Sequence, residues 1–261
     1  MSAVIASHTP QSALDAVRTA GTRIVEILGL SASAVGVRFV PAGVELPAAP
    51  RRLAHARYCQ ALMEARHGSD VLLDGERLSC PAAAAAFGFR PLPEGLRSGK
   101  GLVGFGIVAD PAVGARMFAG MPRLEAGRLR AVHCFPLDRA EHVPDVVVVE
   151  DVVEKLRWIA LAGLHVAGGE RVTSSTAVLQ ATCVDATLIP FLQHRMNLSY
   201  GCYGCRDATD IADAETVLGF PICLLPDILE HLEFLAAKAI PASRGKRALA
   251  AFSRPTEGNP S

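Results

Sequence analysis

A run of four valines, Val146–Val149, constrains the fold more than any other segment of the chain. An apolar run without polar alternation predicts a strand that is buried on both of its faces. A helical pattern follows over residues 152–166, and alternating apolar residues predict further strands at residues 35–40 and 131–135. The sequence therefore predicts an α/β or α+β protein.

Length and charge exclude several classes of protein. The 261 residues are enough for one large or two small domains, and 26 basic residues balance 26 acidic ones, so no nucleic acid is expected as a partner. The chain shows neither a signal peptide nor an apolar run of about 18 residues, so we expect no membrane span. We expect a cytoplasmic protein, in which clustered cysteines are metal ligands or redox groups more often than disulfides.

The remaining patterns divide the chain into four parts. A helix is predicted near the N-terminus, ending at Gly29, and residues 51–67 form a second helix that contains Cys59. Asp74-Gly75 predicts a tight hairpin. A strand is expected at residues 102–108 and a helix at 211–218. The expected divisions are an N-terminal helix, two halves of one compact unit and a flexible tail, at residues 1–29, 30–143, 144–240 and 241–261.

Residues 197–207 are the segment least typical of core or surface. They place Cys202 and Cys205, two glycines and Arg206 in a short turn ahead of a helix. Cys80 precedes Pro81, a residue favoured at the first helical position, so Cys80 lies at or near a helix N-cap. Exposed N–H groups at that position favour a thiolate over a thiol. Both segments are therefore candidates for cysteine chemistry.

The two halves show a faint repeat. Cys59 lies in a predicted helix, and after twenty residues Cys80 stands at a helix start; Cys183 lies in a helix, and after eighteen residues Cys202 stands at another. The repeat predicts similar units of strand, helix, hairpin-like turn and helix start, packed about a pseudo-twofold axis. Two cysteines from each half would then converge on one four-thiol site. Chance recurrence in an alanine-rich chain is the competing explanation.

Eight short segments resemble an uncharacterised bacterial and archaeal group, domain-of-unknown-function family 169. The resemblance implies an intracellular protein with cysteines at the places of Cys59, Cys80, Cys183 and Cys202 and an arginine at that of Arg206. Cys205 stands where a small residue is usual, and the family supplies no activity. The segments are Val35–Phe39, Tyr58–Leu62, Leu78–Pro81, Phe87–Phe89, Phe135–Leu137, Pro144–Val147, Ala181–Cys183 and Gly201–Arg206.

Four thiolates suit either zinc or an iron–sulfur cluster. Structural zinc sites take closely spaced pairs, and only Cys202 and Cys205 form one, so the scattered ligands favour a [4Fe–4S] cluster. Arg206 would offset the charge of such a centre, and Cys205 and His194 are further candidate ligands. The cluster would serve electron transfer, cluster handling or an anaerobic enzyme reaction; whether the protein is an enzyme stays open.

Other interpretations compete with the cluster. Cys202 and Cys205 before a helix are also typical of a thiol–disulfide redox pair, and zinc would make the protein a sensor or binding module. Core packing explains Cys59 and Cys183 equally well. Cys134 and Cys223 are assigned to the core. A redox protein and a small molecule are both candidates for the partner, and nothing in the sequence determines the oligomeric state.

Overall fold

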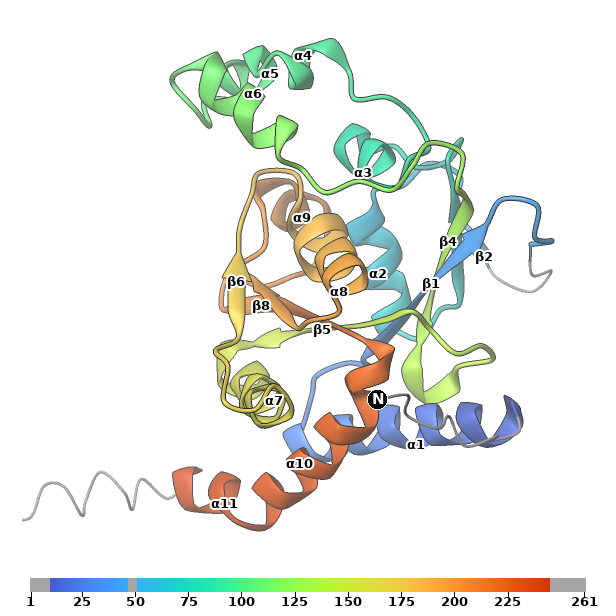
Figure 1. The fold of residues 1–261 in the computed structure, drawn as a ribbon, viewed down its shortest axis with the longest axis vertical. Helices are drawn as coiled ribbons and strands as arrows, with labels where there is room; N and C mark the ends of the chain where they lie inside the picture. Colours follow the sequence, from blue (N-terminus) through green and yellow to red (C-terminus); the bar gives the residue numbers. More distant parts are fainter. Residues whose placement is uncertain (1–9, 47–50, 245–261) are drawn as a thin grey trace, which may run out of the picture.

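The computed structural model describes residues 10–46 and 51–244 of the chain. Within these residues, eight strands form one mixed sheet in the order β2-β3-β4-β1-β5-β8-β7-β6 (Figure 1). Sheet and helices together make a mixed α/β fold, as the sequence predicted. The strands are β1 Val35–Pro41, β2 Arg51–Arg52, β3 Val71–Asp74, β4 Leu129–Pro136, β5 Val146–Val152, β6 Thr173–Ser175, β7 Asn197–Ser199 and β8 Glu215–Pro221.

Helices cover both faces of the sheet. One face carries α1 Pro10–Leu28, α7 Val153–Val166 and α10 Leu225–Ala237, with α11 Ala239–Arg244 after them. The other face carries α2 Tyr58–Arg66, α3 Pro81–Ala86, a π-helix Ala181–Leu188, α8 Ile189–Gln193 and α9 Tyr203–Ala208. In the described part of the chain, no helix has the combination of length and apolar character that crossing a membrane requires.

Three short helices stand apart from these layers. They are α4 Glu94–Arg97, α5 Lys100–Gly104 and α6 Pro111–Ala119, and we call them the α4–α6 lobe. Figure 1 shows the lobe at one end of the molecule, joined to the body by two extended connections. Glycine allows α5 and α6 to meet closely, since a Cβ on Gly114 would lie 3.0 Å from the Cα of Gly99.

The valine run lies at the centre of the sheet. Val146 and Val148 of β5 pack with α2 and the π-helix, whereas Val147 and Val149 pack with α1, α7 and α10. Successive side chains of a strand point to opposite faces, so an apolar run is needed where both faces are covered. The prediction of a strand buried on both faces is confirmed.

The strand order is the same in the two halves when it is read outward from the centre. β1 and β5 pair at the centre, followed outward by β4, β3 and β2 on one side and by β8, β7 and β6 on the other. The predicted hairpin at Asp74-Gly75 is wrong, because β3 pairs with β2 and β4 instead. Duplication and the divisions at 30–143 and 144–240 stay predictions, since strand order does not compare the halves residue by residue.

Other local predictions are also wrong. Residues 51–52 form β2, so the helix with Cys59 begins only at Tyr58, and α5 occupies part of the predicted strand at 102–108. The predicted helix at 211–218 overlaps β8, which is buried between β5 and β7. Residues 241–244 of the expected tail belong to α11, and 245–261 lie outside the described residues. At β2 and β8, pairing with neighbouring strands overrides the local pattern.

The π-helix ends just before a proline. Pro190 lacks the N–H that an α-helix would direct to the carbonyl of Ala186, and its ring would clash with that carbonyl. The freed carbonyl lies against Gly219 of β8, where a Cβ would overlap its oxygen. Wide π turns of this kind occur often at functional sites. Gly219 therefore sets how closely the helix that carries Cys183 approaches the sheet.

We expect Gly219→Ala to destabilise the protein, because the new methyl group overlaps backbone that cannot move aside. The loss should be about 1–3 kcal/mol, typical of overpacking, and is measured by denaturant unfolding. Gly104→Ala is the matched control, since nothing lies within 4 Å of a Cβ there. Equal stability of the two variants would contradict the close approach.

Candidate functional site

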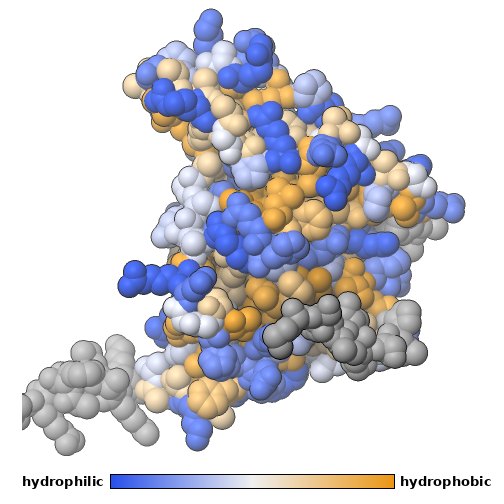
Figure 2. Space-filling view, in the orientation of Figure 1, coloured by the Kyte–Doolittle hydropathy of each residue, from blue (hydrophilic) through white to orange (hydrophobic). Residues whose placement is uncertain are grey.

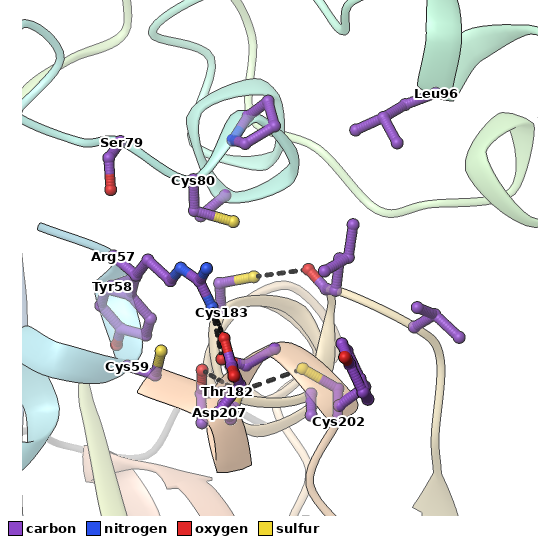
Figure 3. Close-up of a pocket in the computed structure, with 18 of the residues that line it drawn as sticks. Arg57, Tyr58, Cys59, Ser79, Cys80, Leu96, Thr182, Cys183, Cys202 and Asp207 are labelled. Carbon is purple, nitrogen blue, oxygen red and sulfur yellow. Dashed lines mark hydrogen bonds and ion pairs between the residues drawn. The ribbon is translucent and has the colours of Figure 1, made fainter. Parts of the chain in front are cut away.

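A cavity of about 880 Å³ lies between the α4–α6 lobe and the body. Figure 2 shows apolar surface in the hollow beneath the lobe, and Figure 3 shows Cys59, Cys80, Cys183 and Cys202 arranged around one space. Five of the seven cysteines line this cavity. The structure thus brings together the four cysteines that the repeat singled out, and it adds Cys205.

Each thiol reaches the cavity from the start of a helix. Cys59 is the second residue of α2 and Cys183 the third of the π-helix. Cys80 and Cys202 are the N-caps of α3 and α9, which follow β3 and β7. Gly201 has φ +82°, a conformation that suits glycine, and it turns the chain from β7 into α9. Helix starts from four parts of the sequence therefore converge.

Contacts between the side chains are close on one side of the cavity. The Sγ atoms of Cys202 and Cys205 are 3.1 Å apart, and the Cys205 Sγ lies 3.5 Å from the Thr182 hydroxyl. Cys183 donates to the carbonyl oxygen of Leu179 over 3.7 Å. Leu179 has φ +62°, which is uncommon for a leucine and marks a constrained backbone beside the thiols.

The pKa is raised at four of the cavity thiols, Cys80, Cys183, Cys202 and Cys205. Burial raises the pKa of Cys80 and of Cys183, and at Cys80 it outweighs the N–H groups of Ala82 and Ala83. The N–H groups at the N-cap do favour the Cys80 thiolate, as expected, but burial has the larger effect on its pKa. The neighbouring Cys205 thiol and burial raise the pKa of Cys202. At Cys205, Cys202 lowers the pKa, but Cys59 and burial raise it to about 12.

The described side chains do not form a ready metal site. Among residues 10–46 and 51–244, no group of three or more His, Cys, Asp or Glu side chains is arranged to hold a metal ion. Four sulfurs around one zinc would be about 3.8 Å apart, since each bond is about 2.3 Å. A cluster spreads its cysteine ligands over several iron atoms, so they need not approach so closely.

Comparison with known proteins identifies the family. A model of the DUF169 family, described as an uncharacterised ArCR, matches residues 23–231. The chain belongs to the DUF169 family. No curated protein and no solved structure matches it. The family description names no reaction, so the chemistry of this DUF169 protein has to be argued from its cavity.

Two candidate residues lie outside the cavity of the DUF169 protein. Arg206 donates to the backbone oxygens of Tyr200, Ala212 and Glu215, and so joins the segments before and after α9. Its guanidinium does not line the cavity, and exposed His194 does not either. The structure therefore gives Arg206 a role in holding the cysteine turn and leaves His194 away from the thiols.

The other two cysteines differ from each other. Cys134 in β4 is buried, as the sequence predicted, and burial raises its pKa. Cys223 is exposed in the 3₁₀-helix Ile222–Leu224, so its assignment to the core was wrong. An apolar neighbourhood in the sequence does not show which face of a short helix is covered. Neither cysteine lines the cavity.

Arg57 is a cavity residue that the sequence reasoning missed. Its Nη1 donates to the Gly204 oxygen over 2.7 Å and lies 3.6 Å from the Asp207 carboxylate. Its charge also lowers the pKa of Cys80, against the larger effect of burial. The signal in the sequence was its place two residues before Cys59. Arg57 therefore links α2 to the cysteine turn and brings a positive charge to the thiols.

A buried network of ion pairs holds the C-terminal end of α2. Arg66 donates to Asp210 over 2.6 Å and lies 3.6 Å from Glu150 and 3.8 Å from Glu215. It thereby ties the C-terminal end of α2 to the segment that follows α9. Burial raises the pKa of Glu150 to about 7, although Arg66 opposes the shift. A charged Glu150 is therefore unfavourable in the folded protein.

We expect Glu150→Gln to change how stability depends on pH. Between about pH 4.5 and 7 the folded protein keeps a proton that the unfolded chain releases, so stability falls as pH rises. The variant should lack this fall and be more stable at pH 8, by on the order of 1–3 kcal/mol. Unfolding midpoints across pH 4–8 measure it. Exposed Glu154→Gln is the control, and parallel profiles for wild type and Glu150→Gln would contradict the prediction.

Thiol reactivity tests the burial of the site. In metal-free native protein at pH 8, we expect one fast reaction with a thiol-specific disulfide reagent, at exposed Cys223. The other thiols should react only slowly until the chain unfolds. Cys223→Ser should remove the fast phase. A fast phase that survives in this variant would instead show that a thiol of the cavity is accessible and reactive.

Proposed function

We propose that this DUF169 protein binds a [4Fe–4S] cluster through Cys59, Cys80, Cys183 and Cys202. The observation that carries the proposal is the convergence of these thiols, from four separate elements, on one cavity. Core packing alone would not require them to share a cavity, since buried cysteines usually pack as small apolar side chains. Cys134 is an example of that ordinary role.

The surroundings of the thiols suit thiolate ligands once a metal displaces their protons. N–H groups of Ala82 and Ala83 lower the pKa of Cys80, and those of Cys205 and Ala181 lower that of Cys202. Such groups stabilise bound sulfur and tune a cluster. Metal binding removes protons from thiols even where burial raises their pKa. A bound cluster would supply one-electron transfer.

The cluster would serve electron transfer, cluster handling or an anaerobic enzyme reaction. A cytoplasmic location goes with this proposal, because thiols stay reduced there. A redox protein would then be the partner for electron transfer. Zinc is the alternative metal, and the scattered spacing of the ligands in the sequence favours the cluster over it; the absence of a metal-holding group among the described residues bears on both alike. The nearby Cys205 thiol is a fifth candidate ligand.

A thiol–disulfide protein is the second candidate function. The 3.1 Å separation of the Cys202 and Cys205 Sγ atoms favours it. Formation of their disulfide would release two protons and pass two electrons to a partner disulfide, which becomes two thiols. Against this candidate, the pKa of each thiol is raised, and the thiolate is the attacking species.

We expect protein purified without oxygen to be brown, with comparable amounts of iron and sulfide. Single Cys→Ser changes at Cys59, Cys80, Cys183 or Cys202 should lower the iron content and the absorption at about 400 nm severalfold, because each removes one of four ligands. Cys223→Ser is the matched control, since Cys223 is exposed and outside the cavity.

The other outcomes separate the competing functions. A colourless protein that contains zinc lost from the same four variants would establish the zinc site. A metal-free protein that cannot be reconstituted would overturn the cluster. In that case, a Cys202–Cys205 disulfide formed reversibly in a redox buffer would support the thiol–disulfide function. Cluster loss from Cys223→Ser alone would show that the ligand set is wrong.

A further inference from the structure

We propose that the cavity also binds a small organic anion with an apolar body. The apolar part would lie between the α4–α6 lobe and the cysteines, and the anionic group would lie at Arg57. The inference deepens the proposed function, because the molecule would be the substrate or ligand of the same site. It rests on features of the cavity that the cysteines do not account for.

The cavity is larger than its thiols explain. Its volume of about 880 Å³ is within the range of roughly 300–1,000 Å³ found for small-molecule sites. The lobe and its connections supply an apolar wall, and residues before the π-helix add to it. The apolar wall consists of Pro93, Leu96, Phe105, Ile107, Val178 and Leu179. Such a wall offers contact area to carbon chains or rings, and not to a metal.

Two exposed aromatic side chains line the same cavity. Phe105 is 66% exposed and Tyr203 is 67% exposed, although both belong to the cavity lining. They come from opposite sides, since Phe105 follows α5 of the lobe and Tyr203 begins α9 of the body. Covering a large apolar side chain contributes about 1.5–3 kcal/mol. A ligand between lobe and body would gain this contribution from both rings.

Arg57 indicates an anionic group on the ligand. It is the one arginine or lysine among the described residues that line the cavity, and its side chain is 39% exposed. Its interactions with Gly204 and Asp207 use Nη1, while Nε and Nη2 have no hydrogen-bond partner among the described residues. A guanidinium edge with free donors binds carboxylate or phosphate oxygens well.

The lobe is held in place as a preformed wall. Its two connections meet at their base, where Gly127 donates to the Gly88 oxygen over 3.2 Å and Leu124 to the Ala86 oxygen over 2.8 Å. Gly88 has φ +74°, and a Cβ there would overlap the Glu125 oxygen. Ligand sites are usually formed before the ligand binds. The lobe therefore faces the thiols in the free protein.

The probe is 8-anilinonaphthalene-1-sulfonate, an aromatic anion that fluoresces in apolar sites, added to the full chain purified without oxygen. We expect Arg57→Gln and Phe105→Ser each to weaken its binding about tenfold, as loss of a charged hydrogen bond or a large apolar contact does. Arg97→Gln, in the lobe but outside the lining, and Phe234→Ser, 57% exposed on α10, should bind like wild type.

Competition then tests the chemistry of the ligand. Octanoate should displace the probe from wild type, and octanol of the same chain length should do so more weakly. The advantage of octanoate should disappear in Arg57→Gln. Equal binding of the probe by all four variants, or equal competition by acid and alcohol in wild type, would overturn the inference. Circular dichroism of each variant excludes unfolding as the cause.

The same samples distinguish failure of the two proposals. If wild type contains no metal yet shows the Arg57-dependent binding of octanoate, the cluster fails and the anion site stands. If iron is bound through the four cysteines while the Arg57 and Phe105 variants bind the probe normally, the cluster stands and the anion site fails. Cys59→Ser should lower iron while the probe still binds, because Arg57 and Phe105 are unchanged.

Discussion

The contact of the Ala186 carbonyl with Gly219 sets how closely the helix that carries Cys183 approaches the sheet. Pro190 frees that carbonyl from regular helical bonding, and the missing Cβ of Gly219 lets it approach the sheet. The π-helix then presents Cys183 opposite Cys80 and Cys202. On the far side, Arg66 and its carboxylates tie α2, and with it Cys59, to the segment after α9. The thiols converge because the π-helix and α2 are each fixed on the side away from the cavity, by Gly219 and by the Arg66 network.

This arrangement places apolar side chains and thiols in one cavity. Burial raises the pKa of Cys80 and Cys183, so a metal bound there has to displace their protons and would bind more tightly as pH rises. Arg57 lies where the cysteine turn meets α2, and among the described residues it is the one arginine or lysine that lines the cavity. A buried cluster beside a pocket for an organic anion would put a redox centre next to its substrate.

Predictions from the sequence succeeded where one local pattern decides the structure. The valine run, the strand at 35–40 and the helix at 152–166 have patterns that match their surroundings, and each formed as expected. Predictions from local pattern were wrong where strand pairing decides the secondary structure. Residues 215–221 were expected to be partly helical, but the open edges of β5 and β7 pair with them as β8. Asp74-Gly75 favours a hairpin, yet the residues just after it do not pair with β3, because β4 occupies the antiparallel position beside β3.

The sequence by itself determined the fold class and the family and singled out four cysteines as a candidate site, because residue type and spacing carry that information. Only the tertiary structure decided that Cys205 joins these thiols around the cavity, that Arg206 binds backbone oxygens outside it and that Arg57 and Phe105 line it. These relations join residues that are far apart in the chain. They depend on strand order and on close backbone contacts such as that of Gly219 with Ala186, which no local pattern encodes.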